Sequence, residues 1–294
     1  MSDLIQELLQ LMQLEQLEQD IFRGESRNIV GKRVFGGQVL AQALLAASRT
    51  VDAGRQAHSL QAYFLRPGDA SAPIQYRVER VRDGVSFSTR RVVATQGGRT
   101  IFDLAASFQT PEPGIEHQAA AVEAPPPEEL ISDRDAAARF LENEPISENF
   151  RRALLRWDPI ELRPVRPNHP LRPEIRPPVK QVWFRATGPL PDDDSLHRAL
   201  LAYISDRGLL STALLPHGVT FLQRNFQGAS LDHTMWFHQS CRLDDWLLYH
   251  MESPIAMGSR GYVRGQIFTR DGRLVASVAQ EGLIRVHPTE ESAA

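Results

Sequence analysis

Few patterns in this 294-residue chain match a known catalytic signature. The string GASLD at 228–232 begins like the G-x-S-x-G nucleophile elbow but ends in aspartate where that motif needs glycine. The run DDD at 192–194 could bind a metal, yet it directly precedes a helical pattern, where aspartate is expected to cap the helix. The sequence contains no H-E-x-x-H and no ligand pair at metal spacing, so we expect no metal.

A glycine pair gives a second chemical candidate. Gly36 and Gly37 precede Gln38 and an apolar stretch that predicts a helix over 34–51. Backbone N–H groups at a helix start favour negative charge, and glycine leaves room for a ligand to approach. We therefore consider the amides of Gly36, Gly37 and Gln38 as anion donors, with simple helix entry as the alternative. His58 and His233 could transfer protons, but we interpret both as structural.

Composition limits the classes of protein that this chain can be. It is 42% hydrophobic and 23% charged, as expected for a folded globular protein. The net charge of -3 gives no electrostatic reason to bind nucleic acid. No run of about 18 apolar residues occurs, so we expect no stable membrane insertion. Cys241 is the only cysteine and the N-terminus is acidic, which favours a cytoplasmic protein without disulfides.

Prolines divide the chain. Thirteen of the 20 lie between Pro111 and Pro178, and proline disfavours the middle of a sheet. We expect three parts: an N-terminal domain over 1–112, a proline-rich connector over 113–178 and a C-terminal domain over 179–294. Within the connector, 131–145 predicts a helix capped by Ser132 or Asp133.

Both outer parts contain a helix followed by strands. Apolar residues at helical spacing from Leu4 to Leu17 predict an additional helix at the beginning of the first part. After the 34–51 helix come strand patterns at 58–67, 73–96 with a turn, and 99–109. The second part has a strand at 180–188, a helix at 192–208, and further strands at 218–223, 230–239, 246–256, 261–272 and 273–286.

The two parts also align residue by residue. The helix core ALLA at 43–46 recurs at 199–202, an offset of 156, and YFL at 63–65 aligns with WFH at 236–238, an offset of 173. This similarity indicates an internal duplication. The predicted class is α+β, with two antiparallel sheets, each wrapped around a central helix that is apolar on all sides. The two sheets can pair through an edge strand of each.

Several strings together carry a family resemblance. They include VFGGQVLAQAL, HSLQAYFLRPGD, RDGVSFSTRRV, LLAYISD, LDHTMWFH, WLLYHMES and LVASVAQEG, and they occur in one order from about residue 4 to residue 286. In this combination the chain resembles the acyl-CoA thioesterase II family, the double hot-dog thioesterases. The resemblance implies a double hot-dog fold and hydrolysis of fatty acyl-CoA to a free acid and CoA, without a cofactor. We also expect a homo-oligomer, either a dimer or a tetramer.

The resemblance also implies the catalytic residues, all of them in the C-terminal domain. Carried over by motif, they are the acid Asp206 in YISD, the hydroxyl Ser230 before LDHTMWFH, and the amide Gln280 in VASVAQEG. Gln109 closes the corresponding strand of the first half, although not at the same offset, and we take it as the repeat partner of Gln280. No carboxylate lies at the end of the helix at 34–51, where the sequence is AASR at 46–49. We therefore expect one active site per chain.

These residue types suit thioester hydrolysis. A carboxylate can accept a proton from water, while a hydroxyl and an amide can orient that water. We expect the amides of Gly36, Gly37 and Gln38 to face the thioester oxygen. Two alternatives stay open: a non-catalytic acyl-CoA binding protein, and a hot-dog hydratase that pairs histidine with aspartate. His197 and Asp206 lie at opposite ends of the predicted helix, about 13 Å apart, which disfavours the hydratase.

Overall fold

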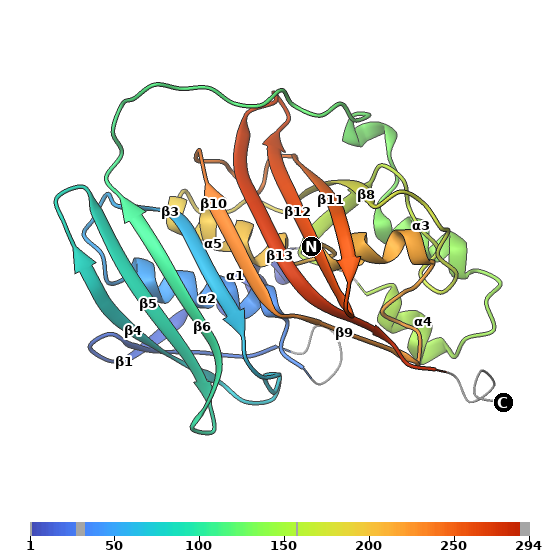
Figure 1. Ribbon diagram of the computed structural model, residues 1–294, viewed down its shortest axis with the longest axis horizontal. Helices are drawn as coiled ribbons and strands as arrows, with labels where there is room; N and C mark the ends of the chain where they lie inside the picture. Colours follow the sequence, from blue (N-terminus) through green and yellow to red (C-terminus); the bar gives the residue numbers. More distant parts are fainter. Residues whose placement is uncertain (1, 28–32, 157, 289–294) are drawn as a thin grey trace.

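The structure is a computed structural model that describes residues 2–27, 33–156 and 158–288 (Figure 1). Thirteen strands form one antiparallel sheet, in the order β1-β2-β4-β5-β6-β3-β10-β13-β12-β11-β8-β7, with β9 paired to β13. The two halves of the sheet join where β3 pairs with β10, with Leu60 opposite Met235. This pairing covers one edge strand of each half, as the duplication predicted.

The first half contains two helices and six strands. Its elements are α1 (Ser2–Met12), β1 (Leu14–Glu18), β2 (Ile21–Gly24), α2 (Gly36–Ser48), β3 (Gln56–Phe64), β4 (Ile74–Asp83), β5 (Phe87–Gln96) and β6 (Arg99–Gln109). The helix predicted to extend to Leu17 is wrong at its end. The chain leaves the helix after Met12 and pairs β1 with β2 at the edge of the sheet, which leaves Leu17 exposed.

The second half repeats this plan. Its elements are β8 (Val179–Ala186), α5 (Asp194–Ser205), the 3-10 helix η2 (Leu210–His217), β9 (Phe226–Ser230), β10 (Asp232–Phe237), β11 (Leu247–Met257), β12 (Arg260–Thr269) and β13 (Leu274–Val286). The strand predicted at 218–223 is wrong: Gly218 ends η2 with a φ of 60°, and turns follow up to β9. Glycine adopts this left-handed backbone without strain.

Four short elements lie between the halves. They are η1 (Pro127–Glu129), α3 (Asp133–Leu141), α4 (Glu148–Leu154) and β7 (Ile160–Pro164). Ser132 caps α3 by accepting a hydrogen bond from the Asp135 amide, which confirms one of the two predicted caps. β7 occupies the outer edge of the sheet, a place where a strand ending in proline costs no hydrogen bond to a neighbour. Before α3, the segment after β6 runs past the upper ends of the strands (Figure 1), and its Pro125 carbonyl accepts from the Trp183 indole.

The helices α2 and α5 lie side by side on one face of the sheet (Figure 1). Every residue from Gly37 to Ala47 and from Leu196 to Ser205 is buried, so both helices are enclosed on all sides, as predicted. Because each half of the sheet wraps its own helix, the two helices pack side by side near the join. That contact places the start of α2 beside the end of α5.

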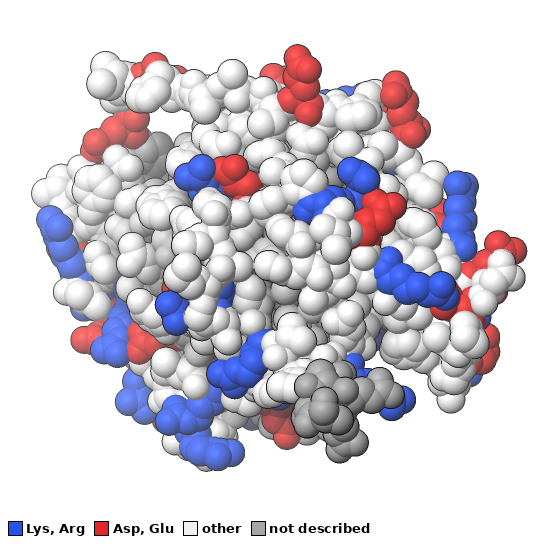
Figure 2. Space-filling model, turned by 45° about the vertical axis from the view of Figure 1, so that its right-hand side comes forward, with Lys and Arg blue, Asp and Glu red and all other residues white. Residues whose placement is uncertain are grey.

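On the face in Figure 2, several basic side chains gather toward the lower left, and elsewhere acidic and basic side chains are mixed, with wide uncharged areas between them. Among the described residues, no helix is both long and apolar enough to cross a membrane.

Candidate active site

Asp206 lies where the two helices meet. It is the C-cap residue of α5, and its Oδ2 accepts a hydrogen bond from the Gly37 N–H at the start of α2, at 3.0 Å. A carboxylate at the end of its own helix is electrostatically unfavourable, whereas the start of another helix stabilises it. The start of α2 therefore supplies the positive environment that Asp206 lacks at its own helix.

The sequence at the start of α2 explains this contact. Phe35 occupies the N-cap position and its side chain makes no capping hydrogen bond, so the first amides of α2 need another acceptor. Asp206 provides one. A Cβ on Gly36 would lie 2.7 Å from Asp206 Oδ2, and one on Gly37 would lie 2.1 Å from the Tyr203 carbonyl oxygen. Only glycine at both positions allows the carboxylate and the two helices to approach so closely.

A chain of hydrogen bonds leads from Asp206 to Ser230 and Gln280. The Ser230 hydroxyl, at the end of β9, donates to Asp206 Oδ1 at 3.1 Å. The Gln280 side chain on β13 donates from Nε2 to Ser230 Oγ at 2.6 Å and is buried. The acid, the hydroxyl and the amide that the resemblance implied are thus in one hydrogen-bonded chain.

His233 extends the same chain. Its Nδ1 lies 2.8 Å from Gln280 Oε1, and its Nε2 lies 2.9 Å from Ser205 Oγ. Because Gln280 donates its N–H to Ser230, its Oε1 must accept, so His233 carries its proton on Nδ1. The ring is completely buried, and burial lowers its pKa below the usual value, which keeps it neutral at pH 7.

A cavity of about 300 Å³ opens onto this chain. Gly36, Asp206 and Ser230 line it, whereas Gln280 and His233 lie behind them. The other lining residues are Arg33, Val34, Phe35, Gly208, Leu210, Ser211, Phe221, Gly228 and Ala229. A reactant in the cavity can therefore contact the carboxylate and the hydroxyl directly, while the amide and the imidazole hold these groups in place.

The three amides considered as anion donors differ in their surroundings. The Gly37 amide donates to Asp206, and the Gln38 amide donates to the Phe35 carbonyl at 3.1 Å. The Gln38 side chain is buried and donates to the Glu25 carbonyl at 3.1 Å. The Gly36 amide has no acceptor within the part of the chain that the structure describes, and Gly36 lines the cavity.

Other sequence candidates lie away from the cavity. His58 on β3 pairs with Ser107 Oγ at 2.8 Å, which agrees with a structural role. Asp193 caps α5 by accepting from the amides of Ser195 and Leu196, as predicted. His197 is buried near the start of α5 and accepts from the Leu243 amide, so it does not pair with Asp206.

Comparisons with known proteins agree with this arrangement. A family model described as acyl-CoA thioesterase matches residues 158–283, and one described as acyl-CoA thioesterase N-terminal domain matches residues 25–109. Acyl-CoA thioesterase 2 of Haemophilus influenzae is 42% identical over 97% of this chain and 99% of its own length. The chain belongs to the acyl-CoA thioesterase II family. Human acyl-coenzyme A thioesterase 8 is also 42% identical, over 95% of this chain and 88% of its own.

Solved structures confirm the fold of this thioesterase. The crystal structure of acyl-CoA thioesterase II from Mycobacterium marinum aligns with a TM-score of 0.75 at 44% identity, over 95% of this chain and 98% of that one. A hot dog fold protein from Alicyclobacillus acidocaldarius aligns with a TM-score of 0.74 at 19% identity, over 95% and 98%. The predicted double hot-dog fold is therefore confirmed.

Sequence reasoning did not place His233 in the site of this thioesterase. The available signal is its position: His233, Met235 and Phe237 alternate toward the buried face of β10, so a histidine there needs polar partners. The sequence also gave no sign that the Gly37 amide binds the carboxylate, since that contact joins the two halves.

Proposed function

We propose that this protein hydrolyses acyl-CoA thioesters by the attack of an ordered water that Asp206 deprotonates, with Ser230 and Gln280 holding the carboxylate and the water in place. Membership of the family gives the reaction, the conversion of acyl-CoA to a free acid and CoA. The assignment of each residue is our own. It rests on the geometry of the chain from His233 to Asp206.

One observation carries the proposal. A carboxylate from one half of the chain lies on the cavity, and the helix start of the other half holds it by a backbone N–H at 3.0 Å. From the described residues each carboxylate oxygen accepts a single hydrogen bond, which leaves it a lone pair, so a water in the cavity can donate to Asp206. This is the geometry that a general base requires.

The reaction then follows from the surrounding groups. Asp206 takes a proton from the water, whose oxygen attacks the thioester carbon to give a tetrahedral oxyanion. The Gly36 amide, which lines the cavity, is the first donor for that oxyanion. The amides of Gly37 and Gln38 could contribute only by exchanging their present acceptors. Collapse breaks the carbon–sulfur bond, and the thiolate of CoA leaves and takes up the proton.

Two further properties belong to the proposal. With Cys241 as its single cysteine, the chain suits a reducing compartment, and we propose the cytoplasm. Hot-dog sheets pair readily at their faces, and we propose a homo-oligomer, a dimer or a tetramer. Sedimentation analysis tests the second point, since a monomer at micromolar concentration would contradict it.

The alternatives predict different behaviour. A hydratase would need a histidine beside Asp206 in the cavity. His197 instead accepts a hydrogen bond from the Leu243 amide, and His233 lies behind Gln280, so neither histidine meets this need. A non-catalytic binding protein would bind acyl-CoA and release no CoA. Measuring CoA release across a series of acyl chain lengths separates binding from turnover.

A single-turnover reaction in ¹⁸O-water tests the role of Asp206. If water attacks the thioester directly, the first acid released carries ¹⁸O from the solvent. If Asp206 attacks instead, it displaces CoA and forms a mixed anhydride. When water opens that anhydride at the Asp206 carbonyl carbon, the first acid carries ¹⁶O from the carboxylate, and an anhydride that opens at the acyl carbon is detected by trapping with hydroxylamine. The second result would overturn the general-base role while leaving the thioesterase activity in place.

A further inference from the structure

The turn after Asp206 is held by residues from other parts of the chain. Residues 206–209 connect α5 to η2, and Gly208 in this turn has a φ of 74°, a left-handed backbone that glycine adopts without strain. Gly208 and Ser211 both line the cavity at Asp206. A group that fixes this turn therefore also fixes the position of the Asp206 carboxylate.

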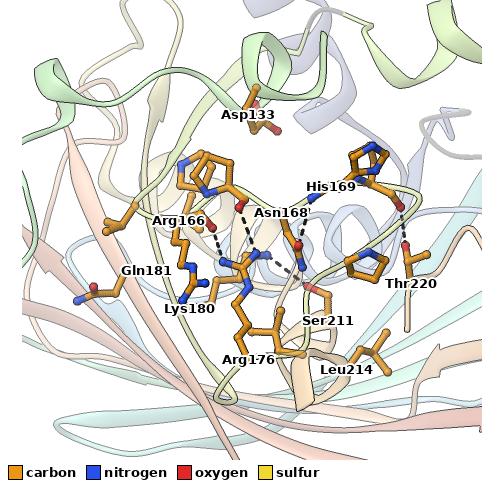
Figure 3. A pocket seen from close by; sticks show the side chains of 18 of the residues that line it. Asp133, Arg166, Asn168, His169, Arg176, Lys180, Gln181, Ser211, Leu214 and Thr220 are labelled. Carbon is orange, nitrogen blue, oxygen red and sulfur yellow. Dashed lines mark hydrogen bonds between the residues drawn. The ribbon is translucent and has the colours of Figure 1, made fainter. Parts of the chain in front are cut away.

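One contact to the turn comes from Lys180 on β8. Its Nζ donates a hydrogen bond to Ser211 Oγ at 3.2 Å, and Ser211 Oγ donates to the Gly208 carbonyl at 2.6 Å. A Cβ on Gly208 would lie 2.9 Å from the same Nζ, so the ammonium group packs against the backbone of the turn. Figure 3 shows Lys180 and Ser211 in a cavity of about 550 Å³, which shares Ser211 with the cavity at Asp206.

Two carboxylates of the connector also act on the turn. Arg207, which lies in the turn, donates to Asp158 Oδ2, and its Nη2 is 3.9 Å from Asp133 Oδ2. Asp133 lines the cavity that contains Lys180, and its negative charge favours the charged form of the lysine. These four side chains, two cations and two anions, form an ion cluster around the turn.

The charge of Lys180 depends on the groups that face it. Burial lowers the pKa of Lys180 to about 8; Asp133 of α3 opposes this shift, whereas Arg207 of the turn and Arg176 of the connector add to it. Arg176 is itself near an anion, Glu174. When Lys180 loses its proton, the ion cluster loses one of its two cations, and Asp133 keeps only Arg207 within the cluster as a counter-charge.

We propose that Lys180 is a positioning residue for the reaction: through Ser211 and Gly208 it holds the turn that carries Asp206, and the connector carboxylates hold the same turn through Arg207. The inference rests on the proposed function, because it takes Asp206 as the base. Misplacing a reacting group by about 1 Å can lower a rate by roughly 10². The proline-rich connector then does more than join the two halves, since it helps to set the geometry of the active site.

Substitutions of Lys180, assayed with octanoyl-CoA, test this role. Lys180→Met keeps an unbranched side chain and removes the charge. We expect kcat to fall roughly tenfold while KM stays within about threefold, because the carboxylate moves and the cavity remains. Lys180→Arg restores a cation and a donor and should recover most of kcat.

A second variant and a control use other parts of the same region. Asp158→Asn weakens the contact to Arg207 and should also lower kcat, by roughly three- to tenfold. Arg166→Met is the control, because Arg166 lines the larger cavity but pairs with Glu174 on the surface. Its kcat should stay within about twofold of the wild type. Thermal unfolding verifies that each variant folds.

The pH dependence of kcat separates positioning from a purely structural role. In the wild type kcat should fall as the pH rises through about 8, where Lys180 loses its proton. Lys180→Met should have a low kcat without this step, and Lys180→Arg should stay active to higher pH because arginine keeps its charge. A loss of stability alone would lower the unfolding temperature and leave the shape of the pH profile as in the wild type.

The outcomes separate this inference from the proposed function. An unchanged kcat in both Lys180→Met and Asp158→Asn would overturn the positioning role, and so would the same alkaline step in the wild type and in Lys180→Met. Either result leaves the proposed function standing if Asp206→Asn has lost activity. If Asp206→Asn keeps full activity, the general-base assignment fails, and the positioning role fails with it.

Discussion

The starts of α2 and α5 are equivalent positions of the duplication, 156 residues apart, yet they are completed in opposite ways. Where the second half has DDD at 192–194, the first half has GGQ at 36–38. Asp193 caps α5 from within its own helix, and Asp194 pairs with Arg198. The start of α2 has no such cap and receives Asp206 from the other half. The start of α5, which its own Asp193 caps, has a structural role, whereas the uncapped start of α2 binds the Asp206 carboxylate.

The strands show the same difference. In the aligned strands His233 corresponds to Leu60, at the offset of 173, and Gln280 corresponds to Ala106 rather than to the predicted Gln109. Leu60 and Ala106 are cross-strand partners and both are buried, so an apolar pair fills the place of the polar one. Asp206 itself corresponds to Thr50, whose hydroxyl donates to the Ala47 carbonyl of its own helix. One scaffold thus carries the polar pair His233–Gln280 in one half and the apolar pair Leu60–Ala106 in the other.

The largest expected loss of activity comes from replacing the acid, Asp206. Asp206→Asn should lower kcat by about 10²–10⁴, because an amide cannot take the proton from water. The matched change at the other helix start, Asp193→Asn, should leave activity within about twofold, since asparagine also caps helices well. Steady-state release of CoA measures both. Full activity of Asp206→Asn would end its assignment as the base.

Activity should be nearly as sensitive to a substitution at the uncapped start of α2. In Gly36→Ala the added Cβ would meet Asp206 Oδ2 at 2.7 Å, so the carboxylate must move. A displacement of this kind should lower kcat/KM by roughly 10–100-fold. Gly114→Ala adds a Cβ with nothing within 4 Å and serves as the control. Equal activity of the two variants would show that the close approach is not needed.

A smaller effect is expected one step behind the cavity. Gln280→Met removes the hydrogen bond to Ser230 and leaves the buried His233 Nδ1–H without an acceptor. We expect kcat to fall about tenfold and the free energy of unfolding to fall by about 1–3 kcal/mol. Gln109→Met, at the end of β6 in the other half, is the control. Denaturant unfolding and CoA release on the same samples test whether Gln280 acts through position or through stability alone.

The smallest effect concerns pH. Burial lowers the pKa of His233 in the folded protein, so the unfolded chain binds more protons below its ordinary value of 6.5. The free energy of unfolding should therefore fall as the pH drops below about 6.5, by at most about 1.4 kcal/mol per pH unit from this group. His233→Leu copies Leu60 of the first half and should flatten that slope. Identical slopes in urea unfolding between pH 7 and 5 would contradict the buried neutral state.

The sequence alone determined most of the framework. Period-two and helical spacing located α2, α5 and the strands of the main sheet, because burial on one face or on all sides leaves a regular apolar pattern. The pattern failed at Leu14–Glu18, where a short edge strand continues a helical spacing, and at 218–223, where an apolar run forms turns. Both are short segments whose structure depends on neighbours distant in the chain.

The active site, too, could be predicted from the sequence only in part. Motifs in the sequence supplied Asp206, Ser230 and Gln280, and the glycine pair marked a helix start open to approach. Only the tertiary structure decided that Asp206 would fill that start, that His233 would hold Gln280, and that Lys180 would lie beside Gly208. These contacts join residues that are tens to hundreds of positions apart. They follow from how α2 and α5 pack and from the register of β10 against β13, which no local pattern encodes.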